Sequence, residues 1–127
     1  MKPAKSARVP MLLTIIWWVA IWVVSSLPAD ELPTVDEVGV DKLAHVGVYF
    51  VLGILLDTWL RRKGLTLKQR LGIFALAVIS AFADEYHQHF IPGRSVSIWD
   101  FVANASGLVL AWLWRFIRHD KSKRPQH

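Results

Sequence analysis

Four long apolar blocks divide the chain and restrict the folds that it can adopt. The blocks are residues 11–27, 43–60, 71–82 and 98–117. Each approaches the length of about 20 residues that crosses the hydrocarbon core of a bilayer, the third only if His87 and its neighbours are included. A soluble bundle would need a polar stripe on each helix, whereas the first block offers only Thr14, Ser25 and Ser26. The sequence therefore predicts an all-α fold, an up-and-down bundle of four transmembrane helices.

The charged residues are divided unequally between the two sides of this predicted bundle. Thirteen of the fifteen Lys and Arg precede the first block, separate the second from the third, or lie at the end of the fourth block or after it. Only Lys42 and Arg94 lie elsewhere. Eight of the ten acidic residues lie on the opposite side, which gives net charges of −6 and +11. The positive-inside rule therefore predicts that both termini are cytoplasmic. On this interpretation the net charge of +5 serves orientation and contact with anionic membrane lipids, and predicts no nucleic-acid partner.

The chain is expected to form one domain over residues 1–127, with basic cytoplasmic tails at 1–8 and 119–127. The absence of cysteine excludes disulfides and thiolate catalysis. The basic start followed by an apolar run resembles a secretory signal peptide. The run is long, however, and no A-x-A cleavage site follows it, so we expect the first helix to be retained.

Capping signals mark the starts of three predicted helices. Asp41 can accept hydrogen bonds from the first turn of the second helix. Thr66 with Gln69 forms a capping-box pattern at the start of the third helix, and Ser97 with Asp100 repeats it at the fourth. These signals predict short connections and antiparallel neighbouring helices.

Two spacings predict contacts within or between helices. Asp57 and Arg61 are four residues apart and can form an ion pair, which favours a structural role for Asp57. Ala103, Gly107 and Ala111 recur every four residues and form a strip that lets another helix approach closely. The partner of that strip is either another helix of the bundle or a second copy of the chain, so a homodimer is a possible assembly.

Polar side chains gather where the second, third and fourth helices have their predicted outer ends. They are Asp41, Lys42, His45 and Tyr49 on the second helix, Asp84, Glu85, His87, Gln88 and His89 on the third, Arg94 and Ser95 in the connection, and Asp100 and Asn104 on the fourth. Short connections bring these ends close together. Ionisable groups at membrane depth are costly, so such a gathering predicts a functional site.

Each of these residues also has a simpler interpretation. Asp41 and Asp100 can act only as helix caps. Lys42 can extend to lipid headgroups, and His89 can lie in solvent. A network of Arg94 with neighbouring carboxylates would satisfy buried charges without any ligand.

Several linked motifs occur in order along the chain. They are Ser25-Ser26-Leu27-Pro28, then Asp41-Lys42-Leu43-Ala44-His45 with Tyr49 and Gly53, then Asp84-Glu85-Tyr86-His87-Gln88 followed by Ile91-Pro92-Gly93-Arg94-Ser95, and finally Asp100 with Asn104 and Gly107. Together they resemble the VanZ-like family of small bacterial membrane proteins. The resemblance implies a multi-pass protein of the bacterial cytoplasmic membrane, with its polar site on the extracytoplasmic side. The family's namesake is associated with resistance to teicoplanin, a glycopeptide antibiotic, and the resemblance brings no settled biochemical activity.

The leading hypothesis is an outer-facing polar pocket that binds or handles an anionic envelope component, such as a lipid or a lipid-linked precursor. Arg94 can hold a phosphate or carboxylate through its planar fork, and Lys42 adds positive charge. The candidate ligand-binding residues are Asp41, Lys42, His45, Tyr49, Asp84, Glu85, Gln88, Arg94, Ser95, Asp100 and Asn104.

Two alternatives stand beside it. The first is a membrane-embedded hydrolase or transferase, with His45 or Glu85 as general base and Arg94 stabilising developing charge. A divalent metal could assist, bound by some of His45, Asp84, Glu85, His87 and Asp100. No H-E-x-x-H or activated-serine motif is present, so the sequence assigns no metal or cofactor. The second alternative is a structural or interaction protein whose acidic outer face attracts a cationic partner.

Overall fold

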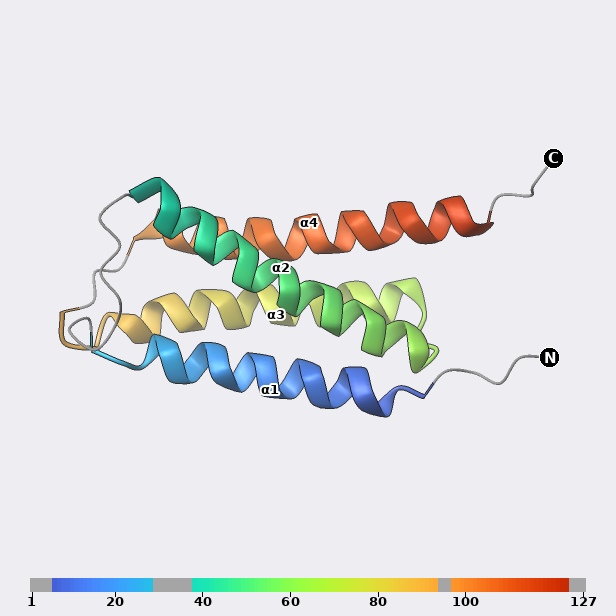
Figure 1. Cartoon of the computed structure of the whole chain (residues 1–127), viewed down its shortest axis with the longest axis horizontal. Coiled ribbons are helices and arrows are strands. Elements are labelled where there is room, and N and C mark those ends of the chain that lie inside the picture. The colour runs from blue at the N-terminus through green and yellow to red at the C-terminus, as the bar shows by residue number, and fades with distance from the viewer. Residues whose placement is uncertain (1–5, 29–37, 94–96, 124–127) are drawn as a thin grey trace.

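Four α-helices make up the regular structure of the described residues in a computed structural model of the chain (Figure 1). The structure describes residues 6–28, 38–93 and 97–123, with the side chains of 6–28, 42–93 and 97–119. The helices are α1 (Arg8–Ser25), α2 (Val38–Arg62), α3 (Leu67–Gln88) and α4 (Ile98–Lys123). Successive helices run in opposite directions, so α1 begins and α4 ends at the same end of the bundle. The predicted all-α class and four-helix order are confirmed.

The helix starts agree with one capping signal and correct another. Thr66 Oγ1 accepts a hydrogen bond from Gln69 N at 3.2 Å, and Gln69 Oε1 accepts one from Thr66 N at 3.0 Å, so the predicted capping box is confirmed. α2 begins at Val38, so the prediction that Asp41 is its N-cap is wrong. Residues 38–41 contain no proline, so they can adopt helical backbone and the helix can begin almost one turn earlier. Asp41 lies within the first helical turn.

The contact between α2 and α4 is the most extensive in the bundle. A Cβ atom added at Gly107 would lie 2.4 Å from the carbonyl oxygen of Val46 and 2.9 Å from the backbone nitrogen of Phe50. A Cβ atom added at Gly53 would lie 2.5 Å from Cβ of Ala111. The two backbones can approach this closely only because side chains are small or absent at the contact. The small-residue strip of α4 is thus covered by α2 of the same chain, and the homodimer stays a prediction.

Helix α1 is joined to the bundle through indole groups. Trp17 Nε1 donates a hydrogen bond to the carbonyl oxygen of Val48 on α2 at 3.0 Å. Trp18 Nε1 donates one to Ser80 Oγ on α3 at 2.9 Å. Most contacts of α1 are made with α2 and few with α3. The indole N–H groups of Trp17 and Trp18 therefore find acceptors on neighbouring helices, whereas the buried Nε1 of Trp22 has no hydrogen-bond partner among the described residues.

Two apolar clusters fill the interior. The first contains Ile21, Tyr49, Leu52, Ala81 and Leu108, and the second contains Leu56, Leu60 and Phe74. The outward surface is also apolar, because large apolar side chains are exposed on every helix. Examples are Ile16 on α1, Leu43 on α2, Ile79 on α3 and Leu110 on α4. An apolar surface of this extent is typical of a protein that contacts lipid or another protein.

Among the described residues, two helices are long and apolar enough to cross a membrane. They are Arg8–Ser25 and Lys42–Arg62, each with a mean hydropathy of 1.7. Helices α3 and α4 carry more charged and amide side chains, including Asp84, Glu85 and Asn104. The two apolar helices are consistent with a membrane protein.

The close contact at Gly107 generates a stability prediction. We expect Gly107→Ala to destabilise the folded protein by about 1–3 kcal/mol, because the new methyl group must push α2 and α4 apart. Gly72→Ala is the matched control, since a Cβ there meets nothing within 4 Å and alanine favours a helix by about 1 kcal/mol. Thermal unfolding of both variants in detergent measures the difference. Equal stability of the two would contradict the tight α2–α4 contact.

Candidate functional site

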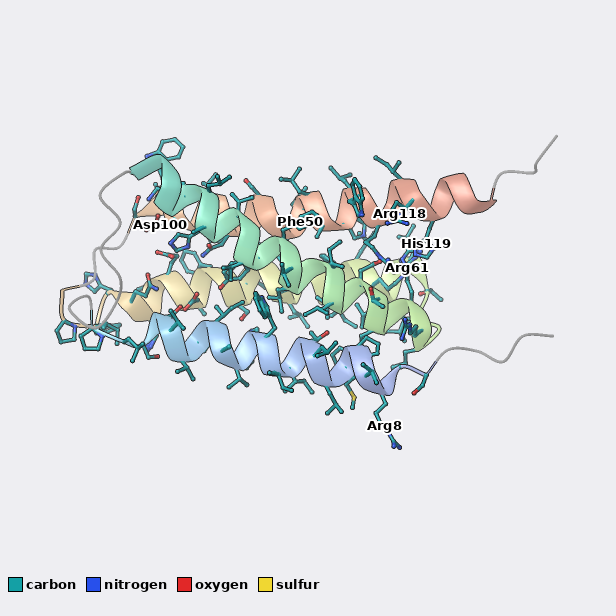
Figure 2. The ribbon with its side chains drawn as sticks, in the orientation of Figure 1. Arg8, Phe50, Arg61, Asp100, Arg118 and His119 are labelled. Carbon is teal, nitrogen blue, oxygen red and sulfur yellow. The ribbon has the colours of Figure 1, made fainter. Side chains whose placement is uncertain are left out.

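Eight polar side chains of α2, α3 and α4 meet near the end of the bundle at which α4 begins, where Figure 2 labels Asp100. We call this group the polar centre. It contains Lys42, His45 and Tyr49 from α2, Asp84, Glu85 and Gln88 from α3, and Asp100 and Asn104 from α4. Gln88 is included because it is buried one turn after Asp84 on the same side of α3. The sequence predicted all eight as site residues.

The α3 members face inward because they share one side of the helix. Asp84, Glu85 and Gln88 retain only 2%, 3% and 3% of their exposure. His87 turns instead toward α1, where its Nε2 lies 2.9 Å from Ser26 Oγ. His89 is exposed, as its simpler interpretation predicted. The structure therefore separates the two histidines from the acidic and amide groups beside them.

Asn104 links the histidine to a carboxylate. It is fully buried, and its Oδ1 lies 2.8 Å from His45 Nδ1. Its Nδ2 donates a hydrogen bond to Glu85 Oε1 at 3.5 Å. Because an amide oxygen only accepts hydrogen bonds, Nδ1 of the imidazole carries the hydrogen in this arrangement. In a neutral ring with this tautomer, Nε2 is the nitrogen that carries the lone pair, as metal binding or general-base catalysis by imidazole requires.

The two aspartates of the polar centre are paired with α2 residues, Asp84 with Tyr49 and Asp100 with Lys42. The hydroxyl of Tyr49 donates to Asp84 Oδ2 at 2.8 Å, and both residues are buried. Lys42 Nζ forms an ion pair with Asp100 Oδ1. Asp100 is thus directed to α2, while Ser97 Oγ accepts a hydrogen bond from the backbone nitrogen of Trp99 at the helix start. Lys42 therefore pairs with Asp100 within the bundle, which the simpler interpretation of Lys42 as a headgroup contact did not include.

Two carboxylate oxygens of the polar centre are buried without a hydrogen-bond partner in the protein. They are Asp84 Oδ1 and Glu85 Oε2. A buried acceptor with no donor carries a desolvation penalty of about 1–3 kcal/mol, so native structures usually satisfy such atoms. The polar centre is therefore short of hydrogen-bond donors, and a group that donates hydrogen bonds or carries positive charge would complete it.

Three side chains of the centre could hold a metal ion. Ligand atoms of His45, Glu85 and Asp100 lie within 4.8 Å of one another. Two donors on one zinc ion are at most about 4.2 Å apart, twice a typical bond length, so the side chains would have to move inward slightly. Asp100 also forms an ion pair with Lys42 through Oδ1. These three are among the five metal-ligand candidates of the sequence.

Three predicted site residues are not placed by the structure. The side chain of Asp41 and residues Arg94 and Ser95 lie outside the described residues.

A hollow of about 480 Å³ lies on the outer face of α4. It is lined by Phe101, Val102, Ala105, Ser106, Val109 and Leu110. This hollow is apolar and includes no member of the polar centre, so it is not the predicted polar pocket.

A second polar group lies at the opposite end of the bundle, where Figure 2 labels Arg61 and Arg118. We call it the basic cluster, and it consists of Asp57, Arg61, Arg70 and Arg115. The predicted pair of Asp57 and Arg61 is confirmed, with Nε 2.7 Å from Oδ2. Arg70 and Arg115 were missed, although spacing could have found Arg115. It follows Ala111 by four residues, so it continues the small-residue strip that faces α2.

The fold and the two polar groups define a class: small helical proteins with an apolar outer surface and a buried polar centre shared by three helices. The chain matches the VanZ/LLP1 family over residues 4–118 and belongs to that family. The resemblance seen in the sequence motifs is thereby confirmed. Comparisons with curated proteins and with solved structures each find no match.

The pair of Tyr49 and Asp84 generates a second prediction. We expect Tyr49→Phe to cost about 1–3 kcal/mol, because both oxygens of the buried Asp84 then lack a donor. Tyr86→Phe is the matched control, since Tyr86 is 60% exposed and should change stability by less than about 0.5 kcal/mol. In an Asp84→Ala background the Tyr49→Phe change should cost less. A double-mutant cycle from thermal unfolding measures this coupling, and additive effects would contradict the hydrogen bond.

Proposed function

We propose that the chain is a multi-pass protein of the bacterial cytoplasmic membrane whose polar centre binds an envelope component on the extracytoplasmic side. Binding would alter susceptibility to glycopeptide antibiotics of the teicoplanin type, the trait associated with the family's namesake. The single observation that carries the proposal is the pair of buried, unpartnered carboxylate oxygens, Asp84 Oδ1 and Glu85 Oε2. Buried acceptors in native structures are usually satisfied, so two unpartnered oxygens in one group favour a bound partner.

The proposed topology places all four helices in the bilayer with both termini cytoplasmic. Exposed apolar side chains on α3 and α4 support this, although these helices carry the acids of the polar centre. They include Leu76, Ile79 and Phe82 on α3 and Val109, Leu110 and Leu113 on α4. The acids face inward, so the lipid would contact mainly apolar atoms. The basic cluster lies at the opposite end, as the positive-inside rule requires of the cytoplasmic side.

The proposed ligand presents hydrogen-bond donors to the centre. The expectation of an anionic ligand depended on Arg94, which lies outside the described residues, and on Lys42, which pairs with Asp100. The acceptors of Asp84 and Glu85 instead favour a hydroxyl or amino group. Lipid-linked envelope precursors carry such groups beside their phosphates. A single ligand could therefore place its donors on the α3 carboxylates.

A second candidate function is a metal-dependent hydrolase or transferase acting on a lipid-linked phosphate. The observation that favours it is the convergence of His45, Glu85 and Asp100, one from each of three helices. Imidazole and carboxylate ligands suit zinc or manganese. The hydrogen bond from His45 Nδ1 to Asn104 is the kind of outer contact that orients a metal-binding imidazole. A bound divalent cation would also reverse the local charge and attract phosphate.

The binding proposal predicts a separation of function from folding. We expect Glu85→Gln to abolish the change in teicoplanin susceptibility that the chain confers on a sensitive host, while protein level and thermal stability stay near those of the wild type. His89→Ala is the control, because His89 is exposed and directly follows the last residue of the same helix. Native mass spectrometry should find an envelope lipid retained by the wild type and by His89→Ala, and lost from Glu85→Gln. Equal loss of folded protein and phenotype in Glu85→Gln would support a purely structural network instead.

The metal candidate has its own test. Protein purified after exposure to zinc or manganese should carry roughly one ion per chain by elemental analysis, and His45→Ala should lose it. His89→Ala should keep the ion, since His89 lies outside the centre. A wild-type protein free of metal would refute this candidate and leave the binding proposal intact.

A further inference from the structure

The basic cluster holds an excess of positive charge around one buried carboxylate. Asp57 is fully buried, and three guanidinium groups from α2, α3 and α4 surround it. Arg61 and Arg115 donate to the same oxygen, Oδ2, through their Nε atoms at 2.7 and 3.1 Å. One carboxylate against three guanidinium groups leaves two positive charges uncompensated within the cluster. Uncompensated charge away from water is costly, so the cluster favours an additional anion.

The unpartnered atoms at this end are mainly donors. Arg70 retains 9% of its exposure, and its Nε and Nη1 atoms are buried with no hydrogen-bond partner. Nη1 lies 3.5 Å from Asp57 Oδ1, so a small shift would pair these two atoms, but Nε would still lack an acceptor. Trp112, which packs against Leu56, Leu60 and Phe74 at the same end, also has a buried Nε1 without an acceptor. The cluster thus needs an acceptor, which is the reverse of the need in the polar centre.

The terminal amino groups of Arg61 and Arg115 are in a position to bind an anion. Arg61 and Arg115 reach Asp57 through Nε, so those hydrogen bonds do not use their terminal amino groups. Their side chains keep 16% and 21% of their exposure, which gives an anion access from the surface. Arg118 is labelled at the same end of the bundle in Figure 2 and adds positive charge. Planar guanidinium groups bind phosphate through paired N–H donors.

We propose that the basic cluster is a binding site for a phosphate-bearing anion, held by Arg61, Arg70 and Arg115. Asp57 positions the three guanidinium groups, and its single charge leaves them net positive. The anion is either the headgroup of an anionic membrane lipid or a free phosphate compound. This site is separate from the polar centre and does not depend on its function.

The test uses the full-length protein in nanodiscs of phosphatidylcholine. A fluorescent phosphatidylglycerol analogue is titrated in, and inorganic phosphate is titrated separately while thermal unfolding is followed. We expect saturable binding of the lipid that is weakened at least about tenfold in Arg70→Gln and less than about twofold in Lys68→Gln. Lys68 is the matched control, because it is exposed, lies on the same turn of α3 and loses the same charge.

The remaining outcomes are also decisive. Stabilisation by inorganic phosphate without saturable lipid binding would identify a free phosphate compound as the ligand. If Arg70→Gln fails to fold, Arg70→Lys keeps the charge without the planar fork and should still bind more weakly than the wild type. Absence of saturable binding of both anions to the wild type would overturn the proposal. Equal weakening in the Lys68 and Arg70 variants would overturn it too, because it would indicate a diffuse surface charge.

Discussion

The contact between α2 and α4 is the constraint on which the other features depend. Because Gly107 has no side chain, the backbones of α2 and α4 approach closely near the middle of the bundle. On each side of this contact, polar side chains of α2 lie opposite polar side chains of α4. Toward one end Lys42 and His45 meet Asp100 and Asn104. Toward the other end Asp57 meets Arg115. One packing contact thus sets the register of both polar groups.

The two polar groups have opposite deficits. The polar centre leaves acceptors of Asp84 and Glu85 without donors. The basic cluster leaves two donors of Arg70 without acceptors, and its one unpartnered acceptor, Asp57 Oδ1, lies 3.5 Å from Arg70 Nη1. Polar side chains between apolar helices have little access to water, so each group must find its partners within the protein or in a ligand. This difference is why we assign a donor-bearing ligand to one end and an anion to the other.

Much of the fold could be predicted from the sequence, because its signals are local. The apolar blocks and the capping box at Thr66 predicted the helices, and the start of α2 was misplaced because Asp41 is a good cap that the helix passes by. The members of the polar centre could be predicted because they occupy corresponding ends of neighbouring helices. Their pairing could not be predicted, since whether Asp84 or Glu85 meets Tyr49 depends on how far each helix is rotated about its axis.

The basic residues show a different limit. In the sequence, Arg70 and Arg115 were used only as positive charges that predict the orientation of the chain in a membrane. This interpretation did not consider where their side chains point. Arg115 could have been placed opposite Asp57 by extending the four-residue spacing of α4 and noting that Gly53 precedes Asp57 by four residues. The burial of Arg70 depends on the tilt of α3, on which the sequence carries no direct information.

The main partner of α2 is the last helix of the chain, which bears on how the protein is made. While α2 and α3 have emerged from the ribosome and α4 has not, Asp57 has only Arg61 and Arg70 beside it, and Lys42 has no Asp100. The Gly107 contact is missing at that stage too. Completion of the native packing must therefore wait until α4 has been synthesised.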